Sequence, residues 1–103
     1  MMVRQGDILI VAIRGELPLG AREVQRERHG VVLAHGEASG HAHRIRSRHA
    51  ELYEHRGQRY LRIRAPVDLT HEEHGAIPLE PGLYRVVRQR EYQPLENPRW
   101  VED

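Results

Sequence analysis

Residues 51–64 read ELYEHRGQRYLRIR, and this stretch decides the fold class. Apolar and polar side chains alternate on the C-terminal side of Gly57, where Leu61 and Ile63 are separated by one polar residue. Side chains of a strand point alternately to opposite faces, so the pattern predicts two antiparallel strands with a turn near Arg56 and Gly57. Leu61 and Ile63 should face the core, and the polar residues between them should face outward.

Apolar runs on both sides of this hairpin extend the β pattern. Residues 8–13 (ILIVAI) are mostly β-branched and predict a buried strand, residues 31–33 predict a second, and residues 83–90 predict a final one. The polar residues 22–28 fit either a charged helical turn or an exposed strand. Together with the Gly and Pro turns, these runs predict a small all-β barrel or sandwich of about six short strands.

Length and composition bound the class of protein. With 103 residues, the chain should form a single small β domain over residues 1–103, with an irregular tail from about residue 93. It contains no cysteine, which excludes disulfides, thiolate zinc sites and a thiol nucleophile. No apolar run approaches the roughly 18 residues of a membrane span, and the first residues lack a signal-peptide layout. We therefore expect a soluble, cytoplasmic protein with no membrane partner.

Two histidine pairs stand out from this background. His41 and His43 end the segment GEASGHAH (residues 36–43), and their i, i+2 spacing places them on one face of an extended segment. Over residues 41–49 the histidine face also carries Ile45, whereas the opposite face carries arginines. The arginine face should be solvated, so we expect the histidine face to point inward.

The second pair, His71 and His74, lies in the sequence THEEH. Thr70 followed three residues later by Glu73 fits a capping box, so we expect one short helical turn near residues 70–74, ended by Gly75. Residues i and i+3 share a face of a helical turn, which would let both imidazoles converge. The spacing is not His-Glu-x-x-His, because that metalloprotease motif would need a histidine at position 75.

Four imidazoles in a small domain indicate a metal site, because neutral imidazole is the commonest protein ligand of transition metals. The candidate ligands are His41, His43, His71 and His74, and the candidate ions are divalent Zn, Fe, Mn or Ni. The lack of thiolates favours an open site, which would suit metal-dependent hydrolysis, oxygen chemistry or small-molecule sensing. Glu37 and Glu73 are the candidate catalytic carboxylates, and Glu72 is also close enough to serve the metal. Whether the protein is an enzyme stays open.

Two other interpretations remain. The histidines could be structural, with one pair hydrogen-bonded in a polar core, the other in a solvated turn, and the domain an accessory interaction module. Alternatively, the protein could associate with nucleic acid through an arginine-striped strand face. All sixteen basic residues are arginine, but the net charge is only +1 and aromatic residues are few. The oligomeric state is open, a homo-oligomer included. The stripe would comprise Arg44, Arg46 and Arg48, extended by Arg62, Arg64, Arg85, Arg88 and Arg90.

The segment from Gly36 to His43 resembles the first motif of cupins, in which a glycine precedes His-x-His and a glutamate follows. Glu51 would be that glutamate, although it lies further from His43 than the family spacing, and the expected second motif is absent. The resemblance implies a β-barrel with a metal at its mouth, held by His41 and His43. The wider combination of GHAH (residues 40–43) and THEEH (residues 70–74) is similar to a group of short bacterial proteins, which implies no mechanism.

Overall fold

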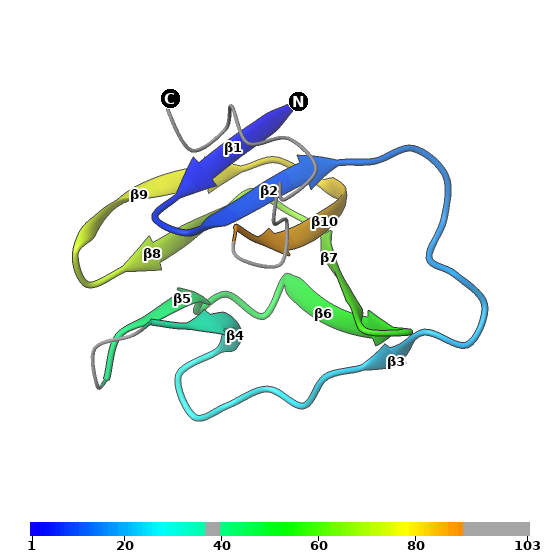
Figure 1. Cartoon of the computed structure of the whole chain (residues 1–103), viewed down its shortest axis with the longest axis horizontal. Helices are drawn as coiled ribbons and strands as arrows, with labels where there is room; N and C mark the ends of the chain where they lie inside the picture. Colours follow the sequence, from blue (N-terminus) through cyan, green and yellow to red (C-terminus); the bar gives the residue numbers. More distant parts are fainter. Residues whose placement is uncertain (37–39, 90–103) are drawn as a thin grey trace.

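The computed structural model describes residues 1–36 and 40–89, and within these ranges the chain is all-β. Ten strands and no helix are found there (Figure 1). In chain order they are β1 (Met2–Gln5), β2 (Ile8–Ala12), β3 (Arg22–Glu23), β4 (Val31–His35), β5 (Ala42–Ile45), β6 (Ala50–His55), β7 (Gln58–Ile63), β8 (Val67–His71), β9 (His74–Leu79) and β10 (Gly82–Arg88). The described residues accordingly contain no helix that could cross a membrane.

The strands form two antiparallel sheets. The larger sheet has six strands in the order β1-β2-β10-β7-β6-β3, and the smaller has four in the order β4-β5-β8-β9. Among the described residues these remain two separate sheets, so the arrangement is sandwich-like and not a closed barrel. The connections from β1 to β2 and from β8 to β9 both turn at the left of the view in Figure 1, where the chain also enters β5.

The hairpin predicted from residues 51–64 is confirmed. Strands β6 and β7 pair with Leu52 opposite Leu61, and the register closes at His55 and Gln58 around the two-residue turn. Both turn residues have a positive φ (51° at Arg56 and 79° at Gly57), which is the backbone geometry of a tight type I′ hairpin turn. The alternation therefore predicted the strands and the turn correctly.

One apolar core joins the two sheets. Leu61 and Ile63 of the hairpin are buried as expected, and Ile8 and Ile10 of β2 pack into the same cluster. The smaller sheet contributes further fully buried side chains, among them Leu33, Ile45, Leu69 and Leu79. Burying a side chain of this size contributes about 1.5–3 kcal/mol, so this core is the main source of stability.

The helical turn expected near residues 70–74 is wrong. Residues 71 and 74 end β8 and begin β9, and they face each other as a cross-strand pair around a two-residue turn. Thr70 does not cap a helix, because its hydroxyl donates to the carbonyl oxygen of Arg44 at 3.1 Å, and its backbone pairs with the same residue of β5. The capping box therefore fails because Thr70 has a partner in a neighbouring strand.

Other differences concern the number and length of the strands. Three strands, β1, β8 and β9, were not predicted, because they are short or interrupted, as at Pro78. Of the two alternatives left open for residues 22–28, the exposed strand is found, as β3 at Arg22–Glu23. Pro78 is tolerated because β9 is an edge of the smaller sheet, where one row of backbone groups has no partner strand. The extended segment predicted over residues 41–49 is regular only at Ala42–Ile45. The tail expected from residue 93 lies outside the described residues.

Candidate metal centre

The four histidines of the two pairs form one cluster. The ring centroids of His71 and His74 are 4.6 Å apart, those of His43 and His71 are 4.4 Å apart, and those of His41 and His71 are 5.6 Å apart. The rings of His43 and His74 are nearly parallel, with centroids 6.2 Å apart. Two stretches about thirty residues apart in the sequence thus bring their imidazoles to one place.

The cluster surrounds a pocket of about 450 Å³. Four segments build it: the β1–β2 turn, the end of β4, the entry to β5 and the β8–β9 hairpin. Its lining residues are Asp7, Gly36, His41, His43, His71, Glu73 and His74. Nitrogen and carboxylate oxygen donors therefore face a common space that a small ion or ligand could enter.

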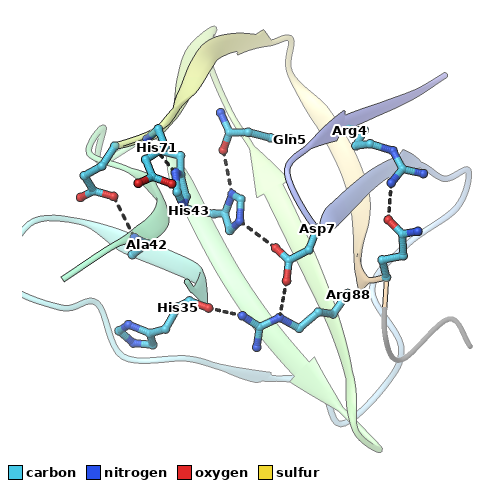
Figure 2. Close-up of polar contacts among 11 residues, drawn as sticks. Arg4, Gln5, Asp7, His35, Ala42, His43, His71 and Arg88 are labelled. Carbon is cyan, nitrogen blue, oxygen red and sulfur yellow. Dashed lines mark hydrogen bonds and ion pairs between the residues drawn. The ribbon is translucent and has the colours of Figure 1, made fainter. Parts of the chain in front are cut away.

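His43 is the buried member of the cluster, with a side chain that is 1% exposed. Both of its ring nitrogens have partners, as Figure 2 shows. Nδ1 lies 2.9 Å from Oε1 of Gln5, and Nε2 lies 3.1 Å from Oδ1 of Asp7. The other carboxylate oxygen of Asp7 accepts a hydrogen bond from Nε of Arg88 at 3.2 Å. His43 thus connects the smaller sheet to the β1–β2 turn of the larger one.

Gln5 determines which nitrogen of His43 carries a proton. Its Nε2 donates to the carbonyl oxygens of Leu69 and Gly75, at 3.0 and 2.9 Å. A flipped amide would instead place its own oxygen against these two carbonyl oxygens, so the orientation of the amide is fixed. The amide oxygen must therefore accept from Nδ1–H of His43. The Nε2 atom is left facing Asp7, and metal-binding histidines are commonly oriented in this way by a hydrogen bond at the other nitrogen.

Burial and neighbouring polar groups shift the pKa values of both His43 and Asp7. Burial lowers the pKa of His43; the hydrogen bond to Asp7 opposes this effect, and the charges of His71 and His74 add to it. Burial alone would raise the pKa of Asp7, but hydrogen bonds and charge from His43 and Arg88 hold it below its usual value. At neutral pH the lowered pKa of Asp7 keeps its carboxylate ionised, and burial opposes a full charge on the ring of His43.

A second set of donors lies on the other side of the cluster. One ligand atom from each of His41, His71 and Glu72 lies within 4.8 Å of the others. Oε1 of Glu72 also accepts a hydrogen bond of 2.9 Å from the backbone N–H of Ala42, which is the main cause that lowers the pKa of Glu72. Two imidazoles and one carboxylate form a donor set that suits divalent transition metals and leaves coordination positions open.

The ring of His71 is held by its own turn. Its Nδ1 accepts a hydrogen bond of 3.0 Å from the backbone N–H of Glu73, so in the neutral ring the proton is on Nε2. A metal bound at Nε2 would need the proton to move to Nδ1, where the N–H of Glu73 already points. Binding through His71 is therefore coupled to a change in the turn between β8 and β9.

Gly6 allows the β1–β2 turn to approach the histidines. It has a φ of 58°, which side chains other than glycine adopt at a cost. A Cβ atom at this position would lie 2.6 Å from Nε2 of His74 and 3.2 Å from Cε1 of His43. Glycine is thus required both by the backbone conformation and by the packing of His74 on the turn.

The two candidate catalytic glutamates have different outcomes. Glu37 lies outside the described residues. Glu73 lines the pocket, is 66% exposed, and places Oε2 3.7 Å from Nδ1 of His41. Sequence analysis missed Gln5 and Asp7 altogether. The signal that could have found them is a polar turn, QGD, immediately before the most apolar strand of the chain.

Three arginines of the expected stripe, Arg44, Arg64 and Arg88, have carboxylate partners within the domain. Nη1 of Arg44 lies 3.7 Å from Glu72, and Nε of Arg64 lies 3.0 Å from Glu51. Arg59 and Arg88 donate to the carbonyl oxygens of Leu33 and His35, which lie on β4, the edge strand opposite β9. These two arginines line a separate cavity of about 730 Å³ and connect the larger sheet to that edge.

Comparison with known proteins gives a family and no activity. Residues 4–89 match the family described as Domain of unknown function (DUF8820). The chain belongs to this family. The DUF8820 match includes every residue that lines the histidine pocket. No curated protein and no solved structure matches the chain.

Neither the DUF8820 match nor the structure supports the resemblance to cupins. Glu51, which would be the motif glutamate, accepts hydrogen bonds from Tyr53 and Arg64. It does not contribute to the wall of the histidine pocket described above. The DUF8820 match agrees with the broader expectation of a family of short proteins whose described function is unknown, although it does not test the GHAH and THEEH pattern.

Proposed function

We propose that the protein binds a divalent transition metal in the histidine pocket, with His41, His71 and Glu72 as the first ligands. The observation that carries this proposal is the mutual approach of their ligand atoms, which lie within 4.8 Å of one another. Donor atoms this close need only small side-chain rotations to meet one ion at a bond length of about 2.0–2.2 Å. His41 lies just before β5, whereas His71 ends β8 and Glu72 follows it, so the ion would also join two neighbouring strands.

The chemistry of the donors narrows the ion. Nitrogen and carboxylate oxygen without sulfur suit Zn²⁺, Fe²⁺, Mn²⁺ or Ni²⁺. Three protein ligands leave at least one position for water or a small molecule, as in catalytic sites. A bound water of lowered pKa would support hydrolysis, and Fe²⁺ with open positions would support oxygen chemistry or sensing. Glu73, at the rim and near His41, is the carboxylate that would exchange protons with such a water.

The proposal is tested by metal stoichiometry and affinity. Untagged protein is freed of metal with a chelator, titrated with Zn²⁺ or Mn²⁺ in a calorimeter, and measured by mass spectrometry of the metal after gel filtration. We expect at least one equivalent to be retained. Replacing His41 or His71 with alanine should weaken this binding at least tenfold. Protein that retains no metal after reconstitution would overturn the proposal.

His29 provides the matched control, because it is exposed and lies outside the cluster. The variant His29→Ala should bind metal as the unchanged protein does. A second readout is specific to His71: because its Nδ1 must release the N–H of Glu73, metal binding should shift the amide resonance of Glu73. An unchanged Glu73 amide in the metal-loaded protein would exclude His71 Nε2 as a ligand.

A further inference from the structure

We propose that the same pocket holds a second divalent cation, between Oδ1 of Asp7 and Nε2 of His43, with His74 beside them. This inference extends the proposed function, because it adds a position next to the His41–His71–Glu72 set. Asp7, the carboxylate of this second position, lies more than thirty residues before the histidines in the sequence.

The hydrogen bonds around His43 have fixed directions. The amide of Gln5 is fixed by its two donations to Leu69 and Gly75, so its oxygen takes the proton of Nδ1. In a neutral ring, Nε2 then presents a lone pair. That lone pair faces a carboxylate oxygen of Asp7 at 3.1 Å. Two acceptors at this distance repel each other unless a proton or a cation lies between them.

The distance between Nε2 of His43 and Oδ1 of Asp7 also fits two ligands of one ion. Two donor atoms that each lie about 2.1 Å from one ion, about 90–110° apart, are separated by about 3.0–3.4 Å. The separation of 3.1 Å between Nε2 of His43 and Oδ1 of Asp7 falls in this range. The pair is therefore already spaced as two neighbouring ligands, and no backbone movement is needed to bring them together.

The surrounding residues hold both donor atoms in place. Arg88 binds Oδ2 of Asp7, which leaves Oδ1 turned toward His43 (Figure 2). The Nε2 atom of His74 and the Cε1 atom of His43 both lie within 3.2 Å of the point where a Cβ of Gly6 would stand. A second imidazole, that of His74, is thus packed against the same turn as His43.

A pocket with two such positions would hold two cations side by side. Where two bound divalent ions lie close together, they can stabilise both the attacking and the leaving oxygen of a hydrolytic displacement, so the second position would extend the hydrolytic chemistry proposed for the first.

The test counts ions in variants of each position. Calorimetric titration with Zn²⁺, with metal analysis after gel filtration, should give two equivalents for the unchanged protein. Asp7→Asn keeps the size of the side chain and removes its charge, and it should retain one equivalent. The matched control is Asp68→Asn, at an exposed position of β8, which should retain two. Equal stoichiometry in Asp7→Asn and Asp68→Asn would overturn the second position.

Crystals of the unchanged protein soaked with Zn²⁺ give an answer that does not depend on variants folding. Anomalous scattering should show one peak between Asp7 and His43 and a second peak near His41 and His71. A single peak near His41 would overturn this inference and leave the proposed function standing. A single peak between Asp7 and His43 would support the inference and overturn the first ligand set, whereas crystals without any peak would overturn both.

Discussion

His43 and Asp7 link the two sheets of the domain through a contact of 3.1 Å between Nε2 and Oδ1. His43 lies on β5 of the smaller sheet, and Asp7 lies in the turn between β1 and β2 of the larger sheet. Gln5, the last residue of β1, holds the opposite nitrogen of the ring. The buried polar contact therefore sits where two otherwise apolar layers meet, and its members should matter both for stability and for binding.

The first prediction concerns Gln5, which is 2% exposed. Gln5→Leu removes the acceptor for Nδ1–H of His43 and the donor for two backbone carbonyls. Leaving buried polar groups without partners costs about 1–3 kcal/mol each, so we expect a loss of several kcal/mol in the free energy of unfolding. Urea denaturation measures this loss. Gln58→Leu, at an exposed position, should change stability by less than about 0.5 kcal/mol.

The second prediction concerns pH. The folded pKa of His43 lies below the ordinary value of 6.5, so the unfolded chain binds a proton before the folded protein does. Stability should therefore be fully present above pH 6.5 and should fall as the pH drops below it. The lowered pKa of Asp7 removes further stability below its ordinary value of 3.8. Urea denaturation of metal-free protein between pH 7.5 and pH 3 measures this decline.

The control for the pH prediction is the variant His29→Gln, which should retain the same decline because His29 lies outside the pocket. The opposite outcome would be informative. Protein that becomes more stable between pH 7.5 and pH 5.5 would mean that the attraction between a charged His43 and Asp7 outweighs burial. A neutral His43 would then be excluded in the metal-free state.

The third prediction separates the two roles of Gly6. Gly6→Ala adds a Cβ atom that would lie 2.6 Å from Nε2 of His74, and it also forces alanine into a positive φ of 58°. Gly57→Ala has a similar backbone cost, since its φ is 79°, but its Cβ would meet nothing within 4 Å. Both should lose about 1–2 kcal/mol of stability, and only Gly6→Ala should also weaken metal binding. Equal metal affinity in the two variants would contradict the position given to His74.

Sequence alone predicted those parts of the fold that depend on local alternation. The hairpin of β6 and β7 follows from the spacing of Leu61 and Ile63, and the buried strand β2 follows from its β-branched run. The prediction from sequence was wrong at residues 70–74, because a threonine followed three residues later by a glutamate fits a helix cap as well as it fits the observed β-turn. The partner that decided the outcome, the backbone of Arg44, is 26 residues away in the sequence.

The site shows the same limit. The spacing of His41 and His43 predicted an inward strand face, and His43 is indeed buried, whereas His41 keeps 24% of its side chain exposed. The pair His71 and His74 converges, but across a β-turn and not along a helix. Asp7 could not be found from spacing, since only the packing of the β1–β2 turn against β5 brings it to His43.

The fourth prediction concerns Arg59, which donates to the carbonyl oxygen of Leu33 at 2.8 Å and so covers the edge of β4. Arg59→Met keeps much of the aliphatic length and loses the donor. A hydrogen bond from a charged group contributes about 1.5–3 kcal/mol, and partial exposure of this one places the expected loss near the lower figure. Thermal or urea unfolding measures the loss. Arg56→Met, at the exposed turn of the same hairpin, should have little effect, and an equal loss in both variants would contradict the edge-covering role.

The last prediction contrasts two adjacent glutamates in the β8–β9 turn. Glu72 belongs to the donor set with His41 and His71, whereas Glu73 lies at the rim, with Oε2 3.7 Å from His41. Glu72→Gln retains an oxygen that can accept from Ala42 N–H but loses the charge that attracts a cation, so Zn²⁺ affinity should fall at least tenfold. Glu73→Gln should leave affinity within about threefold, a difference of less than about 1 kcal/mol in binding free energy. Calorimetric titration of both variants measures this contrast, and circular dichroism verifies that both are folded. If Glu73→Gln loses more affinity than Glu72→Gln, the carboxylate ligand is Glu73, and the donor set must be reassigned.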